Sequence, residues 1–549
     1  MAEKLTNEQQ AAVDSRERSL LVSAAAGSGK TKVLVERLFS YVEREGANLD
    51  DFLIITYTRA AASELRGKIA KALTERMERD PGNYHLRQQM LRVYRADIKT
   101  VDAFCTALLR ENCHLLGEDA RGHALRPDFR VLDENEAQVL RERVLARTLD
   151  DFYGRLTTGG TLLADTLGAG RDDSALEDLV LELHAKLQAQ PYEDKWLEAQ
   201  RAFWRAVPDK IEDTPYGKIL LNEMRRKARH CKNLLQRAAQ EMCANDALNQ
   251  KYAPAFLDAS YQLEALEGKT AEGWDAARGV TIAFPRLAAV KDSDGGEMKA
   301  RMKSLWDNCK ETVKGFAEIF SASSDEAVED LRTMASAMLA LIDLTADFSR
   351  RYNEEKRRRN SADFSDQEHE AIRLLIGEDG APTELARIVS ARYREIMVDE
   401  YQDTNEVQNR IFDAISCKGE NLFTVGDVKQ SIYRFRLADP TIFLEKYRRY
   451  ADAAKAADGQ PRRMVLSRNF RSRQEVLTAT NLVFGDIMSQ EMGEMDYTAD
   501  EQLYFGADYY AEAADRETEM HVISVEDTPE EKFDRTEAEA RFTARRIRQ

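Results

Sequence analysis

The stretch from residue 20 to residue 42 has residue types and spacing that suit the binding of a nucleoside triphosphate. An apolar run, LLVS, is followed by the glycine-bearing loop AAAGSGKT and then by a helical pattern. Glycines in such a loop let backbone N–H groups point at phosphate oxygens, and the helix start adds partial positive charge. We expect Lys30 to reach the β and γ phosphates and Thr31 to ligate Mg²⁺. The common form of this loop opens with Gly, where this chain has Ala24, and the alternative is an ordinary turn of small residues. The predicted ATP-binding loop comprises Ala24, Ala25, Ala26, Gly27, Ser28, Gly29, Lys30 and Thr31.

An acidic pair supplies the second part that such a loop requires. Asp399 and Glu400 directly follow an apolar β-type run at residues 396–398. Open α/β sheets bind ligands at the carboxyl ends of their strands. We therefore expect Asp399 to hold Mg²⁺ and Glu400 to polarise the attacking water as a general base. Most acidic pairs are surface charges, so this interpretation depends on the GSGKT loop in the same chain.

The elements that must position these residues come from both ends of the chain. Apolar β-type runs, usually followed by a loop and a helical pattern, lie at residues 19–23, 52–56, 395–398, 421–425 and 464–466. This alternation is typical of parallel α/β units. Between the two blocks, leucines recur at helical spacing and all four tryptophans occur, which we interpret as core anchors. The pattern indicates an α/β domain that contains a large inserted helical domain.

Composition limits the class of protein. The chain has 549 residues, of which 43% are hydrophobic and 32% are charged, as in a soluble globular protein of roughly three or four units. No apolar run approaches the roughly 20 residues that span a bilayer, and the six cysteines lack zinc or iron–sulfur spacing. The net charge of −17 argues against a basic coat along the whole chain, but it leaves room for a local basic groove. A basic cluster at residues 356–360 is by itself most simply a solvated helix face.

Further segments occur in an order that resembles a known family. They are LTNEQQAAV, IITYTRAAASELRGKI, IKTVDAFCTALL, DFSD, VGDVKQSIYRFRLADP and LSRNFRS, at residues 5–13, 54–69, 98–109, 363–366, 425–440 and 466–472. Together with the loop and the acidic pair, they resemble the UvrD/RecB-like branch of superfamily 1 helicases. Three more segments, RPDFRVLDENEA, YEDKWLEA and GEMDYTADEQLYFGA, resemble the AddA-type helicase/nuclease subunits of bacteria.

The resemblance implies roles for further residues around ATP. Gln9 would read adenine, and Phe470 would pack on the adenine ring. Gln430 would sense the γ-phosphate and report it to the DNA side. Arg471 would stabilise transition-state charge, which suits a planar guanidinium.

The resemblance also implies a surface for single-stranded DNA. Aromatic side chains beside arginines stack bases without sequence preference, at roughly 1–3 kcal/mol per base. The alternative for the aromatic members is ordinary core packing. The expected DNA-binding residues are Thr56, Tyr57, Thr58, Tyr433, Phe435 and Arg436.

The expected fold class is α/β, with a RecA-like P-loop lobe on a parallel sheet, a large all-helical insertion and the beginning of a second RecA-like lobe. The expected domains are the first motor lobe at 1–117 and 361–460, the helical insertion at 118–360, and the start of the second lobe at 461–549. By resemblance, we expect the last motor motifs and a nuclease domain to follow residue 549. For that reason we expect the 549-residue chain to bind ATP with weak or no unwinding.

The resemblance predicts a 3′→5′ ATP-dependent DNA motor in double-strand-break repair and recombination, with ATP and Mg²⁺ as cofactors. The expected partners are single-stranded and duplex DNA and a second protein chain of the AddB type, and the expected location is the cytoplasm, at the nucleoid. Two alternatives stay open: a UvrD-type repair helicase without a nuclease, and an ATP-dependent DNA-binding module that does not hydrolyse ATP. Another kind of P-loop ATPase is disfavoured by the YQD and GDxxQ segments.

Overall fold

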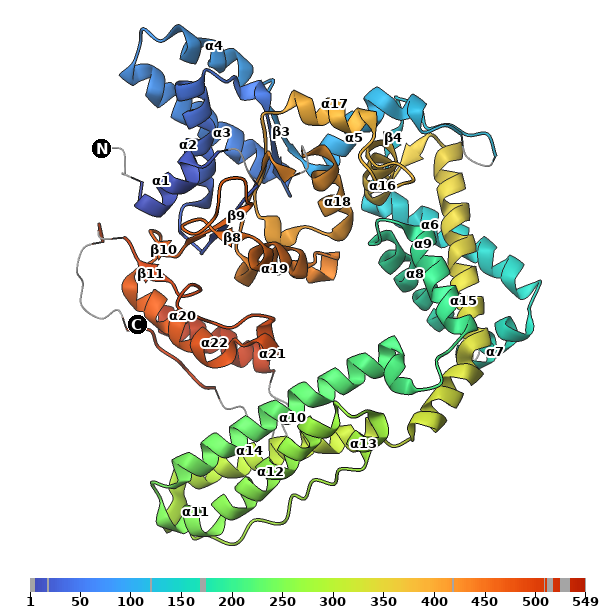
Figure 1. Ribbon diagram of the computed structural model, residues 1–549, viewed down its shortest axis with the longest axis vertical. Coiled ribbons are helices and arrows are strands. Elements are labelled where there is room, and N and C mark those ends of the chain that lie inside the picture. The colour runs from blue at the N-terminus through green and yellow to red at the C-terminus, as the bar shows by residue number, and fades with distance from the viewer. Residues whose placement is uncertain are drawn as a thin grey trace.

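A seven-stranded parallel sheet lies at the centre of the α/β part of the chain (Figure 1). The computed structural model describes residues 5–16, 19–118, 121–167, 174–416, 419–507, 509–510, 517–523 and 534–548. The strand order is β3-β2-β6-β7-β1-β9-β8, and each neighbouring pair is parallel. The strands are β1 (Leu20–Ala24), β2 (Phe52–Thr56), β3 (Asp97–Thr100), β6 (Glu395–Val398), β7 (Leu422–Gly426), β8 (Ala451–Asp452) and β9 (Arg462–Leu466).

Helices cover both faces of this sheet, as the continuous apolar runs of its strands require. Alternate residues of β2 point to opposite faces: Phe52 and Ile54 join one hydrophobic core, and Leu53 and Ile55 join the other. The first core also contains α2 (Lys30–Glu45), α3 (Arg59–Arg79) and α4 (Tyr84–Arg92). The second contains α5 (Val101–Asn112), α16 (Phe364–Leu375), α17 (Glu384–Arg392), α18 (Glu406–Ile415) and α19 (Pro440–Arg449).

The five expected strands are confirmed within two residues at each end. The edge strand β3 was not predicted, because three of its four residues carry charged or polar side chains. Strand β9, at residues 462–466, pairs with β1 in the first sheet. Residues 461–549 were predicted to form the start of a second lobe. The first strand of this range, β9, instead belongs to the same seven-stranded sheet as β1.

The middle of the chain is helical, as predicted, and forms two groups (Figure 1). α6 (Glu134–Tyr153), α7 (Thr158–Leu167), α8 (Ser174–Gln188) and α9 (Glu193–Arg205) pack on the long helix α15 (Ser324–Arg358). The second group lies at the far end of α15, away from the sheet. Its helices are α10 (Pro215–Met242), α11 (Asp246–Lys251), α12 (Ala253–Lys269), α13 (Trp274–Arg278) and α14 (Asp292–Ile319). Trp204, Trp274 and Trp306 are buried in these groups, which confirms that they are core anchors.

The two ends of the helical insertion meet beside the α/β part of the chain. β4 (Arg130–Val131) pairs in parallel with β5 (Ser361–Ala362). Just before β5, the buried Lys356 ammonium donates to Asp363 Oδ2 over 2.9 Å and to Asp366 Oδ1 over 2.7 Å. The interpretation of residues 356–360 as a solvated helix face is therefore wrong for Lys356. This lysine fastens α15 to the DFSD segment at residues 363–366.

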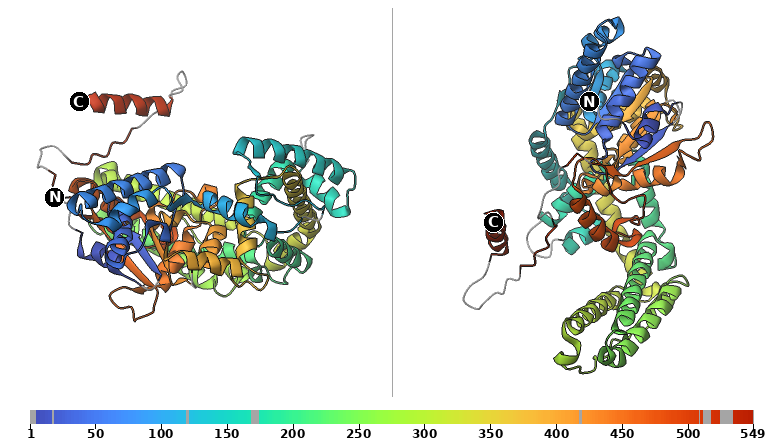
Figure 2. Two further views of the ribbon diagram at one scale, coloured as in Figure 1. Left: turned by 90° about the horizontal axis from the view of Figure 1, so that it is seen from above. Right: turned by 90° about the vertical axis from the view of Figure 1, so that its left-hand side faces the viewer.

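After β9 the chain leaves the sheet. β10 (Arg468–Asn469) and β11 (Tyr504–Phe505) form a small parallel pair, and α20 (Gln474–Ile487) and α21 (Gln490–Gly493) lie between them in sequence. The last described helix, α22 (Arg535–Arg548), stands off from the rest of the molecule (Figure 2) and buries no residue. Among the described residues, no helix has the length and apolar character needed to cross a membrane.

Replacing Lys356 by Ala should destabilise the protein strongly, because the buried Asp363 carboxylate and the partly buried Asp366 carboxylate lose their shared cation. Removal of one partner from a buried ion pair costs about 3–5 kcal/mol of the free energy of unfolding. Urea denaturation of the two proteins measures the difference. Lys186→Ala, which removes the exposed partner of Glu182, should change little, and an equally small effect of Lys356→Ala would contradict the proposed joint.

Candidate nucleotide-binding site

The GSGKT loop has the backbone geometry that phosphate binding requires. β1 ends at Ala24 and α2 begins at Lys30, with Gly27 at φ +70° and Gly29 at φ +86° between them. These positive φ values are costly for residues that carry a Cβ atom. At Gly27 there is no room for one either, since it would lie 2.7 Å from Asn469 Nδ2. The loop therefore leads directly into the N-terminus of α2, where backbone N–H groups can bind a phosphate.

The acidic pair lies beside this loop, as the sequence predicted. β6 and β1 are both paired with β7 in parallel, so the three strands present their carboxyl ends at one edge of the sheet. There the Lys30 ammonium lies 2.8 Å from Glu400 Oε2, although 370 residues separate them along the chain. Lys30, Asp399 and Glu400 thus form one site.

Opposed influences act on the pKa of the Asp399 carboxylate. Burial, and then the neighbouring Glu400 carboxylate, raise the pKa of Asp399 to about 6, while Lys30 acts in the other direction. The Glu400 N–H donates to Asp399 Oδ1 over 3.0 Å. Glu400 itself has φ +51°, a left-handed backbone conformation that costs about 1–3 kcal/mol in a non-glycine residue. Such strain is common at functional sites, where surrounding structure imposes it.

Unpartnered polar atoms border the same site. Among the described residues, the buried atoms without a hydrogen-bond partner include Ser28 Oγ in the loop and Asp403 Oδ1 after the acidic pair. The described residues contain no cluster of three or more His, Cys, Asp or Glu side chains that could hold a metal. Mg²⁺ commonly uses one or two carboxylates together with substrate phosphates and water, so Asp399 with Thr31 is a donor set that fits it.

A hydrogen-bond chain connects the acidic pair to the GDxxQ segment. Gln402 Nε2 donates to Glu400 Oε2 over 2.9 Å, and Gln402 Oε1 accepts from the Asp427 N–H over 2.9 Å. Gln430 Nε2 then donates to Asp427 Oδ2 over 2.8 Å. Gly426 is required here, because a Cβ atom on it would lie 2.3 Å from Gln402 Oε1. Gln402 and Asp427 are not among the predicted site residues, although both lie within segments that the sequence singled out.

The two predicted adenine contacts line one cavity. This cavity of about 390 Å³ lies between α1 (Asn7–Asp14), the loop and the segment after β9. Gln9 Nε2 donates to the Ser28 carbonyl over 2.8 Å, and Phe470 faces the same space. The cavity lies beside the phosphate loop, and its binding of an adenine ring stays a prediction.

Asn469 fixes the segment that carries Arg471. Its Nδ2 donates to the Ala26 carbonyl over 2.7 Å, and its Oδ1 accepts from the N–H groups of Arg471 and Ser472 over 2.8 and 2.7 Å. The Phe470 N–H also donates to the Gly27 carbonyl over 2.8 Å. Arg471 is thereby placed next to the loop. Asn469 lies in the LSRNFRS segment, but the identity of one asparagine could not predict that its side chain forms three hydrogen bonds.

The first predicted DNA-binding segment follows β2. Thr56 is buried, and the Thr58 hydroxyl caps α3 by accepting from the Ala61 N–H over 3.0 Å. The Tyr57 ring packs against the hydrophobic core, and its hydroxyl lies 2.5 Å from Thr404 Oγ1. Burial raises the pKa of the Tyr57 hydroxyl well above its ordinary value. The Tyr57 ring thus has the core packing that was the alternative for it, and contact between this segment and DNA stays a prediction.

The second predicted segment has a different character. Phe435 is 76% exposed, and its ring centroid lies 6.0 Å from that of the partly buried Tyr433. Ile432 beside them is also exposed. The side chain of Arg436 lies outside the part that the structure describes. The exposed ring of Phe435 leaves base stacking possible at this surface.

Asn469→Ala should weaken ATP binding, because it releases both the phosphate loop and the Arg471 segment. Each hydrogen bond contributes a net 0.5–1.5 kcal/mol, so the loss of three predicts a Kd for ATP at least about tenfold higher. Equilibrium titration with ATP and Mg²⁺ measures it. Asn83→Ala, which removes the cap of α4 far along the chain, serves as the control and should leave the Kd unchanged. Equal Kd values for Asn469→Ala and the unmodified chain would rule out this role.

Glu368 on α16 provides a pH test of the packing behind the site. It accepts from Gln408 Nε2 over 2.7 Å and Asn405 Nδ2 over 3.4 Å, yet burial raises its pKa from 4.5 to about 7. The folded state thus holds this proton more tightly than the unfolded state. The resulting stabilisation is present below pH 4.5 and is lost as the pH rises through about 7.

Glu368→Gln has no such proton to lose. The variant should therefore gain stability relative to the unmodified chain as the pH rises from 4.5 to 7, by up to about 3 kcal/mol, and keep the gain above pH 7. Unfolding transitions at pH 5 and pH 8 measure the difference. A stability difference that does not depend on pH would contradict this explanation.

Comparison with known proteins agrees with this geometry. A family model described as the UvrD/REP helicase N-terminal domain matches residues 5–451. The A subunit of the ATP-dependent helicase/nuclease of Acetivibrio thermocellus is 35% identical, over 99% of this chain and 46% of its own length. The proteins of the same name from Ruminiclostridium cellulolyticum and Alkaliphilus oremlandii are 34% and 36% identical, over 99% of this chain and 46% and 45% of their own lengths. The chain thus spans about half the length of these relatives, and the resemblance to AddA-type proteins is confirmed. The chain belongs to the UvrD/REP helicase family, whose N-terminal domain it carries over most of its length.

Proposed function

We propose that this chain hydrolyses ATP to drive movement along single-stranded DNA, as the motor part of a helicase/nuclease. The observation that carries the proposal is the meeting of Lys30, Asp399 and Glu400 at one edge of the sheet, beside a glycine loop with the required backbone. The printed names of the relatives, which include both helicase and nuclease, support it.

The residues divide the chemistry among them. Lys30 binds the β and γ phosphates, while Thr31 and Asp399 hold Mg²⁺, which when bound neutralises phosphate charge. In the structure, the Lys30 ammonium pairs with the Glu400 carboxylate. Phosphates that attract Lys30 would release the Glu400 carboxylate to accept a proton from the attacking water. Arg471, held next to the loop by Asn469, stabilises the charge that develops on the transferred phosphoryl group.

The hydrogen-bond chain through Gln402 gives a route by which ATP hydrolysis at Glu400 would change the contacts with DNA. A change at Glu400 alters a partner of Gln402, which in turn holds Asp427 and, through it, Gln430. Residue 430 is followed within five positions by the exposed Phe435. We propose that bases stack at Tyr433 and Phe435, and that Thr56, Tyr57, Thr58 and Arg436 contribute to the same DNA path.

The activity of the whole protein is proposed from its relatives. It would move 3′→5′, separate duplex DNA and act in double-strand-break repair and recombination together with a second protein chain of the AddB type. It would work in the cytoplasm, at the nucleoid.

Glu400→Gln tests the proposal. It should lower DNA-stimulated phosphate release by at least about 100-fold, because a general base contributes 10²–10⁴-fold, while the Kd for ATP changes little. Glu406→Gln, six residues further on and paired with Arg410, is the control and should retain activity.

Two results would count against the proposal. Turnover by Glu400→Gln at the rate of the unmodified chain would exclude Glu400 as the base. ATP binding without any DNA-stimulated turnover in the unmodified chain would favour the alternative, a binding module that does not hydrolyse ATP.

A further inference from the structure

The helix that carries Gln9 is short and has little apolar anchorage. α1 has eight residues, spanning about 12 Å, and its buried residues are Gln9, Ala12 and Val13. At its start, Gln9 Oε1 accepts from the Thr6 N–H over 3.0 Å while Gln9 Nε2 donates to the loop. Polar contacts at both ends therefore add to the packing of Ala12 and Val13 in setting its position.

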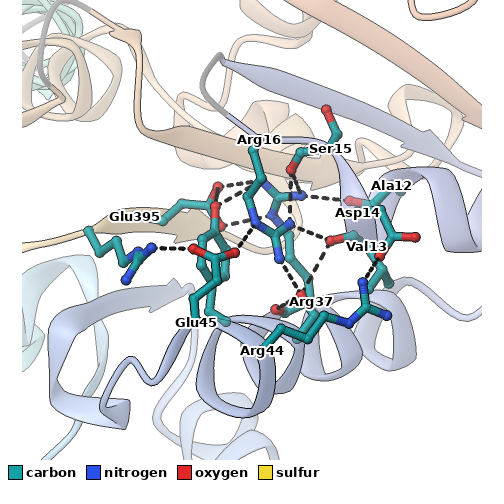
Figure 3. A network of polar contacts seen from close by, with 12 residues as sticks. Ala12, Val13, Asp14, Ser15, Arg16, Arg37, Arg44, Glu45 and Glu395 are labelled. Carbon is teal, nitrogen blue, oxygen red and sulfur yellow. Dashed lines mark hydrogen bonds and ion pairs between the residues drawn. The ribbon is translucent and has the colours of Figure 1, made fainter.

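The other end of α1 is held by an arginine from the phosphate-loop helix (Figure 3). Arg37 Nη1 on α2 donates to the carbonyls of Ala12 and Ser15, both over 2.6 Å. These belong to the last turn of α1, where carbonyl groups lack partners within the helix. Arg16 Nη1 donates to the neighbouring Val13 carbonyl over 2.6 Å. Guanidinium groups thus replace the missing helical hydrogen bonds.

The rest of the Arg37 guanidinium is fixed by strand β6. Its Nε and Nη2 donate to the two carboxylate oxygens of Glu395 over 2.8 and 2.5 Å. Nη2 also donates to the Tyr41 hydroxyl over 3.5 Å, so all five N–H groups of Arg37 have partners. Arg37 is 1% exposed, and Glu395 is buried with it. Glu395 is the first residue of the strand whose far end leads to Asp399 and Glu400.

We infer that Arg37 is a positioning residue for base recognition, which clamps the end of α1 to α2 and β6 so that Gln9 stays against the adenine cavity. Arg37 lines no part of that cavity and acts only through α1. Ala12 lies three residues, about one helical turn, after Gln9, so movement of the clamped end is passed directly to Gln9. The clamp also joins the base-reading helix to the strand that ends in the catalytic pair. This inference rests on the proposed ATP site.

Arg37→Lys separates this role from general stability. Lysine keeps a positive charge beside Glu395, but its single ammonium cannot reproduce the planar fork that serves two carbonyls and a carboxylate. The Kd values for ATP and for UTP, each with Mg²⁺, give the base selectivity. Arg37→Lys should raise the Kd for ATP about tenfold, the equivalent of one lost hydrogen bond to the base, and leave the Kd for UTP within about twofold.

Three further variants complete the experiment. Gln9→Ala should lose selectivity in the same way. Glu395→Gln loosens the clamp without changing Arg37, so it keeps the inference testable if Arg37→Lys fails to fold, and should also lower selectivity. Arg76→Lys alters another buried arginine that pairs with Glu36 of α2 but does not touch α1, and should keep selectivity.

The outcomes are distinct. Unchanged selectivity in folded Arg37→Lys or Glu395→Gln, or equal weakening of both nucleotides, would overturn the role of Arg37 while leaving the ATP site intact. The same loss in Arg76→Lys would also overturn it. If the unmodified chain binds ATP no better than UTP, the proposed adenine site itself fails.

Discussion

The ion pair between Lys30 and Glu400 is the contact on which the account of this molecule depends. It joins the phosphate loop at the N-terminal end to the acidic segment that follows the helical insertion predicted at residues 118–360. The pair can form only because β6, β7 and β1 are parallel neighbours that end at the same edge. The strand order therefore brings the site together. If β6 lay elsewhere in the sheet, Asp399 and Glu400 would not lie beside Lys30.

Elsewhere in the molecule, buried ion pairs occupy places where an apolar core would serve stability equally well. Arg37 with Glu395 and Lys356 with Asp363 are both removed from water, and such pairs are weak sources of stability compared with hydrophobic replacements. Both join separate elements of the fold, one at the end of α1 and the other where α15 meets the α/β part. Their directional bonds define the relative positions of elements that apolar packing alone would fix less strictly.

The sequence predicted five of the seven strands of the large sheet, the loop, the acidic pair and the helical insertion, because each has a local pattern: apolar runs, glycine spacing or a helical period. Local patterns did not predict the roles of Asn469 and Gln402. Asn469 forms hydrogen bonds with three partners, and Gln402 links Glu400 with Asp427. These side chains gain their roles only from neighbours brought close by folding. The same holds for Lys356, whose burial within a basic cluster could not be inferred from its neighbours in sequence, and for β9, whose partner β1 lies at the other end of the chain.

The most direct test of the shared site is the location of a bound metal and nucleotide. Crystals grown with Mn²⁺ in place of Mg²⁺ and a non-hydrolysable ATP analogue would give an anomalous signal that marks the ion. We predict one peak between Thr31 and Asp399, with the γ-phosphate beside Lys30 and the base between Gln9 and Phe470. A peak remote from Asp399, or a triphosphate bound away from Lys30, would contradict it.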